Sequence, residues 1–126
     1  MIKVLPIQSK DLQKEICEKC GAEYDPDLLA YAAYTDDRLA GVCQFKLTDK
    51  GGVIKNISPT IDHEDKEALF VMGRGALNFI DLCGVHFATY CGEAMDEPLL
   101  RRIGFKKNSD GIFEINLEGF FTDHCH

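Results

Sequence analysis

The stretch from 85 to 105 restricts the fold of this chain more than any other part of its sequence. The run Val-His-Phe-Ala-Thr-Tyr predicts a strand over 85–90, and a short helix is expected over 93–102. Asp96 is suited to cap this helix, and Gly104 can adopt the left-handed conformation that ends it. A strand, a short helix and a Gly-Phe pair therefore precede the last strand of the chain.

The remaining sequence predicts strands and helices in a definite order. Strands are expected at 3–7, 28–34, 39–47, 53–58 and 112–117, and helices from Ser9 to about Cys20 and from Asp62 to Cys83. Three consecutive strands with short connections form an antiparallel meander, and the long helix after them allows the central pair to run parallel. We therefore expect a single domain over 1–126 of the α/β (α+β) class, with a mixed, mostly antiparallel central sheet flanked by helices.

The spacing of apolar residues predicts which faces of these elements are buried. Leu12, Ile16 and Cys20 share one face of the first helix, and Cys17 lies to one side of it. The apolar positions of the long helix are Leu69, Met72, Ala76, Ile80 and Cys83. Its segment Met-Gly-Arg-Gly-Ala lies within this pattern, so we interpret the two glycines as a site of close packing or a kink. In the strand over 39–47, Gln44 alternates with apolar neighbours and is expected on a solvated face.

This order of elements resembles the GNAT acyltransferase superfamily over roughly the whole chain. Three short motifs carry the resemblance: Asp37-Arg-Leu-Ala-Gly41, Ile57-Ser-Pro59 and Leu99-Leu-Arg-Arg-Ile-Gly-Phe105. The resemblance implies an N-acyltransferase that moves an acetyl group from acetyl-CoA to an amine, either a small molecule or a peptide. The alternative is a catalytically degenerate protein of the same fold that binds a ligand or a partner, because a fold does not fix a function.

The resemblance also implies where acetyl-CoA would lie. The family holds the diphosphate of the cofactor on backbone N–H groups of a glycine-rich turn, where a strand leads into the long helix. The matching positions are Ile57, Ser58, Lys66 and Ala68, but the segment 60–67 reads Thr-Ile-Asp-His-Glu-Asp-Lys-Glu and contains no glycine. A carboxylate ~4 Å from a phosphate costs about 1 kcal/mol in water and about 4 kcal/mol at a less hydrated surface. The acids are therefore expected to weaken cofactor binding while they stabilise the helix dipole.

The acid and base of acyl transfer are expected near the end of the strand over 85–90. The family's acidic tyrosine matches Leu100, which has no proton to donate, and its asparagine matches Glu93. Tyr90 is the substitute candidate for the acid, and Glu93 for a base that acts through a water. Cys91 is a candidate nucleophile, which would need a lowered pKa and a base partner.

The net charge of −7 limits the partners of the chain. It argues against nucleic acids and anionic membrane surfaces, and it tolerates a cationic amine. No apolar run approaches the ~20 residues that span a membrane. The sequence shows no secretion signal, so its six cysteines are expected as free thiols in a cytoplasmic protein. A monomer and a homodimer both remain open.

Two cysteines have the spacing of a zinc-knuckle pair. A structural zinc site needs four ligands, and no second pair accompanies Cys17 and Cys20. The tail His124-Cys125-His126 could complete a site only by folding back. We therefore expect two packed thiols, with no metal site, ahead of zinc and ahead of a redox couple.

Overall fold

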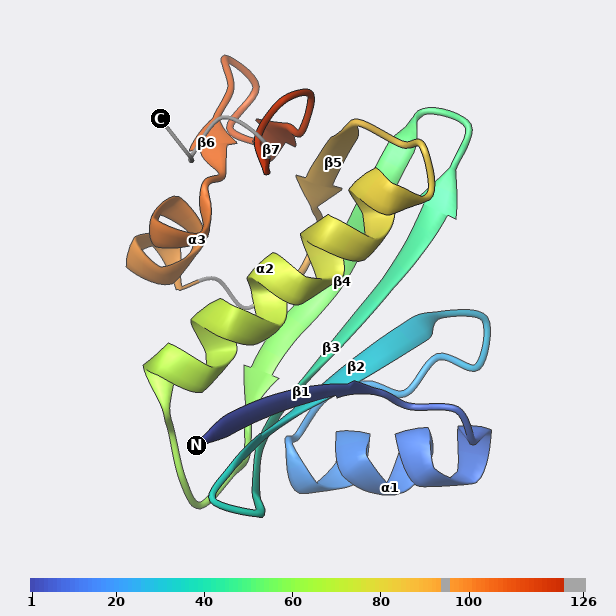
Figure 1. Ribbon diagram of the computed structural model, residues 1–126, viewed down its shortest axis with the longest axis vertical. Coiled ribbons are helices and arrows are strands. Elements are labelled where there is room, and N and C mark those ends of the chain that lie inside the picture. The colour runs from blue at the N-terminus through green and yellow to red at the C-terminus, as the bar shows by residue number, and fades with distance from the viewer. Residues whose placement is uncertain (94–95, 122–126) are drawn as a thin grey trace.

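The computed structural model describes residues 1–93 and 96–121, which form a mixed sheet with helices on both faces (Figure 1). The elements are β1 (Ile2–Pro6), α1 (Lys10–Lys19), β2 (Leu29–Thr35), β3 (Arg38–Thr48), β4 (Gly51–Pro59), α2 (Lys66–Leu82), β5 (Phe87–Tyr90), α3 (Glu97–Ile103), β6 (Lys106–Lys107) and β7 (Phe113–Asn116). The predicted order of elements is confirmed, and the short β6 is an addition to it.

The sheet has the strand order β1-β2-β3-β4-β5-β7-β6. Among these neighbours β4 and β5 alone run parallel, and the other described pairs are antiparallel. This confirms the expected meander and the expected parallel central pair. Figure 1 shows α2 crossing the sheet over β3 and β4, with α3 beside it and α1 near the β1–β2 end. The larger core lies under α2 and α3, and a smaller one lies under α1.

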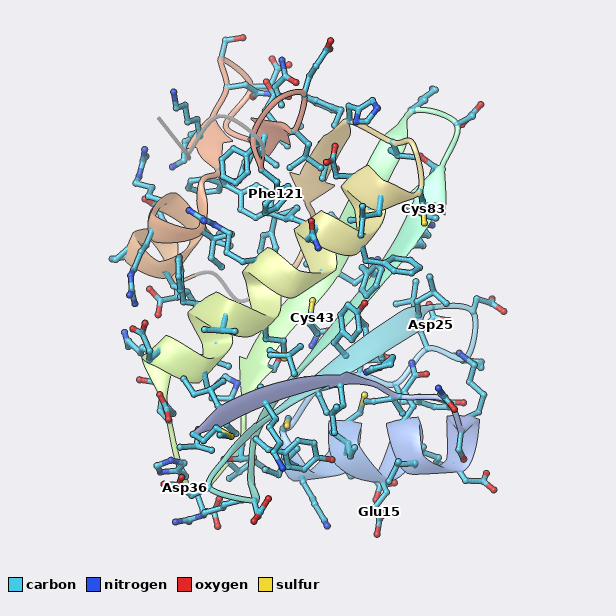
Figure 2. All side chains as sticks on the ribbon, viewed as in Figure 1. Glu15, Asp25, Asp36, Cys43, Cys83 and Phe121 are labelled. Carbon is cyan, nitrogen blue, oxygen red and sulfur yellow. The ribbon has the colours of Figure 1, made fainter. Side chains whose placement is uncertain are left out.

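The long helix begins four residues later than its apolar pattern predicts. The Thr60 hydroxyl donates to the His63 carbonyl at 2.6 Å, which closes a turn before the helix, and Asp65 then caps the first turn. Four of the five predicted core positions are buried, namely Leu69, Met72, Ala76 and Ile80. The prediction is wrong for Cys83, which follows the last helical residue and is exposed, as Figure 2 shows at the end of α2.

The buried face of α1 agrees only in part with the predicted one. Ile16 and Cys20 are buried as predicted, but Leu12 is exposed, and Gln13 and Cys17 are buried in its place. Gln44 is also buried rather than solvated, because α1 covers this part of β3. The two glutamine amides compensate for their burial by pairing, since Gln13 Nε2 donates to Gln44 Oε1 at 2.9 Å.

The packing of α2 against α3 depends on Gly73. A β-carbon there would lie 2.6 Å from Cδ1 of the buried Ile103, so a larger residue would force the Ile103 side chain to shift. The predicted role in close packing is confirmed for Gly73 and not for Gly75, where a β-carbon would make only an ordinary contact. Arg74 lies beside this contact and donates from Nε to the Ile103 carbonyl at 2.5 Å. Its guanidinium also lies 4.9 Å from the centres of the Phe70 and Phe120 rings, which joins α3 and the C-terminal segment to α2.

Candidate functional site

The two parallel strands of the sheet separate in the middle of β4. The β4–β5 ladder pairs Gly52–Ile54 with Ala88–Tyr90, and the Cys91 N–H then donates to the Ile54 carbonyl at 2.9 Å. Beyond that bond β4 continues to Pro59 without pairing with β5. We call residues 55–59 of β4 and residues 91–93 after β5 the strand fork. An open strand edge of this kind can bind an extended ligand through main-chain hydrogen bonds.

A cavity of about 450 Å³ lies in the strand fork. Its lining residues come from the loop after α1, from β3 and from both arms of the fork: Gly21, Ala22, Glu23, Asp25, Leu28, Gln44, Lys55, Asn56, Ser58, Cys91, Gly92 and Glu93. Gln44 pairs with Asn56 in the sheet, and Val42 with Ser58, so their side chains share the face that α1 covers. The cavity therefore opens on the α1 face, at the end of the short loop that follows α1.

The floor of the cavity is a chain of hydrogen-bonded side chains. Gln44 Nε2 donates to Asn56 Oδ1 at 3.0 Å, and Asn56 Nδ2 donates to Ser58 Oγ at 2.9 Å. Gln13 lies behind Gln44 and accepts from Lys10 Nζ at 3.1 Å. Each amide is thus fixed in one orientation, and the Ser58 hydroxyl, which accepts from Asn56, keeps its own proton as a donor for the cavity.

The charged side chains around the cavity are mainly acidic. Glu23, Asp25 and Glu93 contribute three carboxylates, and Lys55 contributes one ammonium group. Glu93 and Lys55 are both exposed to solvent. Carboxylates that outnumber cations at a cleft favour a cationic ligand, which agrees with the negative net charge of the chain.

Two of the predicted site residues meet in this cavity, and the predicted acid does not line it. Glu93 and Ser58 lie on opposite arms of the strand fork and both line the cavity. Tyr90 packs against Phe105 in the core under α2 and α3, with ring centres 6.3 Å apart. The pKa of the Tyr90 hydroxyl is raised to about 12, mainly by burial. The role of Tyr90 as an acid stays a prediction.

The other predicted cofactor contacts lie on the α2 side of the sheet. Ile57 packs against the core under α2, and Ala68 is fully buried in the first turn of that helix. Lys66 is exposed and pairs with Asp96, the N-cap of α3, with 3.1 Å between Nζ and Oδ2. This ion pair raises the pKa of Lys66, mainly through the hydrogen bond to Asp96, and it joins the starts of α2 and α3. The six predicted residues therefore divide between the two faces of the sheet.

The thiols and the leucine considered for chemistry have different surroundings. Leu100 is buried in the core, and its side chain has no proton to donate. Cys91 is exposed and lines the cavity. Cys17 and Cys20 are buried under α1, and burial raises their pKa values to about 11 and about 12, as expected for packed neutral thiols.

Metal binding and membrane insertion find no support in the described residues. Within 1–93 and 96–121, no group of three or more His, Cys, Asp or Glu side chains is arranged to hold a metal ion. The tail His124-Cys125-His126, weighed above as a source of ligands, lies outside the described residues. No helix in the described part of the chain has the length and apolar character needed to cross a membrane.

The sequence did not identify the amides that form the cavity floor. Gln44 and Asn56 stand among apolar residues in their strands, which is the pattern of a half-exposed strand. Gln13 was not identified either, because it lies one position away from the apolar residues that predicted the buried face of α1. Only the pairing of Gln13 with Gln44, 31 positions apart, reveals the network, and sequence spacing does not encode that contact.

Comparison with solved structures identifies the fold. Models of protein families and the sequences of curated proteins gave no match. The ribosomal-protein-S18-alanine N-acetyltransferase of Escherichia coli superimposes with a TM-score of 0.69 at 13% identity, over 93% of this chain and 94% of that one. The PaiA N-acetyltransferase of Thermoplasma acidophilum, solved with coenzyme A, gives 0.68 at 13% identity, over 92% and 99%. A GNAT family acetyltransferase of Brucella melitensis, solved with acetyl-CoA, gives 0.67 at 13%, over 92% and 88%. The chain has the GNAT fold.

Coenzyme A, which this fold implies, fits only part of the site. The strand fork offers an open strand edge beside the cavity. At the start of α2, however, the Ala68 N–H already donates to the Asp65 carboxylate at 3.1 Å. A diphosphate has to bind to such N–H groups at a helix N-terminus. The residues at the start of α2 therefore do not fit the diphosphate of the cofactor.

Proposed function

We propose that this protein is an N-acyltransferase that acetylates an amine bound in the cavity of the strand fork, with a thioester as donor. Acetyl-CoA is the donor that the fold implies. The observation that carries the proposal is the position of Glu93, which lines a cavity of about 450 Å³ where the parallel strands separate. A carboxylate there can attract a protonated amine and accept its proton through a water.

The acceptor is a small amine or the amine of a peptide. The carboxylates of Glu23, Asp25 and Glu93 favour a ligand that enters as a cation. The Ser58 hydroxyl accepts from the Asn56 amide and can donate its own proton to an oxygen of the ligand.

The experiment measures release of free thiol from acetyl-CoA in the presence of a panel of amines. Glu93→Gln is expected to lower kcat/KM by about 10²–10⁴-fold, the range typical of a lost general base. Glu15→Gln is the matched control, because Glu15 is an exposed glutamate on α1 that does not line the cavity (Figure 2). Equal activity of the two variants would show that Glu93 has no role in the mechanism. If no amine in the panel is acetylated, the proposed enzymatic function would be rejected.

A binding protein without catalysis is the second candidate. Leu100 supports it, since the position that matches the family's acid holds a buried leucine. For a binding protein, we expect calorimetry to detect heat when an amine binds, and we expect no acyl transfer to that amine. Glu93→Gln should then weaken the binding of the amine.

A further inference from the structure

The Asp65 carboxylate occupies the N-terminus of α2. One oxygen accepts from the Ala68 N–H at 3.1 Å, and the other accepts from the Thr35 hydroxyl at 2.7 Å. The Thr35 bond is the largest of the causes that lower the pKa of Asp65, followed by the backbone bond from Ala68. Asp65 thus remains an anion bound at the place where a helix N-terminus would hold an external one.

Two backbone N–H groups of the loop before the helix are also engaged. Thr60 donates to the Ala40 carbonyl at 3.1 Å, and Ile61 donates to the Lys19 carbonyl at 3.0 Å. The first of these bonds ties the loop to β3, and the second ties it to the end of α1. A diphosphate could use these donors only if the loop between β4 and α2 were rebuilt.

The cations around the start of α2 are paired with carboxylates. Three pairs surround it: Lys66 Nζ with Asp96 Oδ2 at 3.1 Å, Arg102 Nη2 with Glu67 Oε2 at 2.7 Å, and Arg38 Nη2 with Asp62 Oδ2 at 3.9 Å. A diphosphate would have to take these cations from their partners and would leave the carboxylates near its own charge. Electrostatics at this place therefore oppose a second anion.

The strand fork has none of these obstacles. Its β4 arm has an edge free of β5 beyond Ile54, and a neutral, extended chain with two amide groups can hydrogen-bond to such an edge. The pantetheine arm of a thioester donor has this chemistry, and its nucleotide diphosphate does not.

We propose, on the basis of the function proposed above, that this protein recognises its donor through the pantetheine thioester alone, and that Asp65 excludes the diphosphate from the start of α2. The donor class is then any acyl-pantetheine thioester, with or without the nucleotide. Asp65 acts here as an internal substitute for the phosphate.

Calorimetry with three probes tests this inference, namely CoA, pantetheine and adenosine 3′,5′-bisphosphate. The dissociation constants of CoA and pantetheine are expected to lie within threefold of each other, and the bisphosphate is expected to give no heat. In Asp65→Gly the dissociation constant of CoA should fall at least tenfold, and that of pantetheine should stay unchanged. Glycine is well tolerated at an N-cap, so the variant should fold.

Ser9→Ala is the matched control. Ser9 caps α1 through the Leu12 N–H, at a helix start outside the cavity. This variant should lose stability and keep the ratio of the two dissociation constants at the parent value. CoA binding more than tenfold tighter than pantetheine in the parent protein would overturn the inference and leave the proposed function standing. An unchanged ratio in Asp65→Gly would overturn the role of Asp65. If neither CoA nor pantetheine binds, the proposed function fails and this inference fails with it.

Discussion

The hydroxyl of Tyr90 lies directly against the backbone of Gly92, in the space that a side chain at position 92 would need. The Lys55 carbonyl borders the same space, 2.7 Å from where a β-carbon would be. The three residues come from the two arms of the strand fork and the strand end between them. Gly92 is therefore the residue that lets the chain leave β5 beside β4 and open the cavity.

Gly92→Ala is expected to lower the free energy of unfolding by about 1–3 kcal/mol, as overpacking does. Lys55 lies between Ile54 and Asn56, which both pair with β3, so its carbonyl cannot move aside cheaply, and the Tyr90 ring is held against Phe105. Urea denaturation of the two proteins measures the difference. A midpoint equal to that of the parent would show that position 92 has more room than the structure gives it.

The two glycines of α2 are expected to respond in opposite ways to alanine. At Gly75 a β-carbon would make an ordinary contact with Val4 Cγ1 at 3.5 Å, so Gly75→Ala should gain about 0.5–1 kcal/mol from helix propensity. At Gly73 the β-carbon would lie 2.6 Å from Ile103 Cδ1, and the cost of about 1–3 kcal/mol should exceed that gain. Thermal denaturation should show a higher melting temperature for the first variant and a lower one for the second. The same sign for both would contradict the packing of α3 on Gly73.

The buried amides are expected to behave as a coupled pair. Gln44→Met should cost about 1–3 kcal/mol, because the Gln13 amide and the Asn56 carbonyl oxygen lose a partner in the interior. The double variant Gln13→Met, Gln44→Met should cost less than the sum of the single variants, with a coupling of about 0.5–3 kcal/mol. Chemical denaturation of the four proteins gives this coupling.

Gln8→Met is the control for that cycle. Gln8 is exposed, so its effect should add to that of Gln44→Met without coupling. Additivity in the cycle of Gln13 and Gln44 would mean that the two amides do not share a network.

Most of the fold could be predicted because its elements are encoded by local periodicity. The 3.6-residue pattern located α2, and alternation predicted the strand over 112–117, in which Phe113, Ile115 and Leu117 are buried. The start of α2 was missed because it depends on the Thr60–His63 turn and on the Asp65 cap, which compete with the apolar pattern for the same residues.

The candidate site could be predicted only where it lies next to a strand end. The resemblance implied Ser58 and Glu93, which lie near the ends of two strands, and both line the cavity. Gln44 was assigned to solvent, because alternation reports which side of the strand a residue faces and not what covers that side. The cover is α1, and its contact with β3 joins residues far apart in the sequence.

The buried thiols are expected to make the stability fall in alkaline solution. Burial raises the pKa of Cys17 to about 11, and the pKa values of Cys20 and Cys43 to about 12, from the ordinary 9.0. The unfolded chain therefore loses these protons near pH 9 while the folded protein keeps them, so the contribution is complete below pH 9 and decreases above it. Each thiol contributes at most about 1.4 kcal/mol per pH unit in this range.

Urea denaturation under reducing conditions at pH 8, 9 and 10 should show the decrease. Cys17→Ala should reduce its slope, and Cys83→Ser, at an exposed thiol, should leave it unchanged. A free energy of unfolding that is constant from pH 8 to 10 would contradict the burial of these three cysteines.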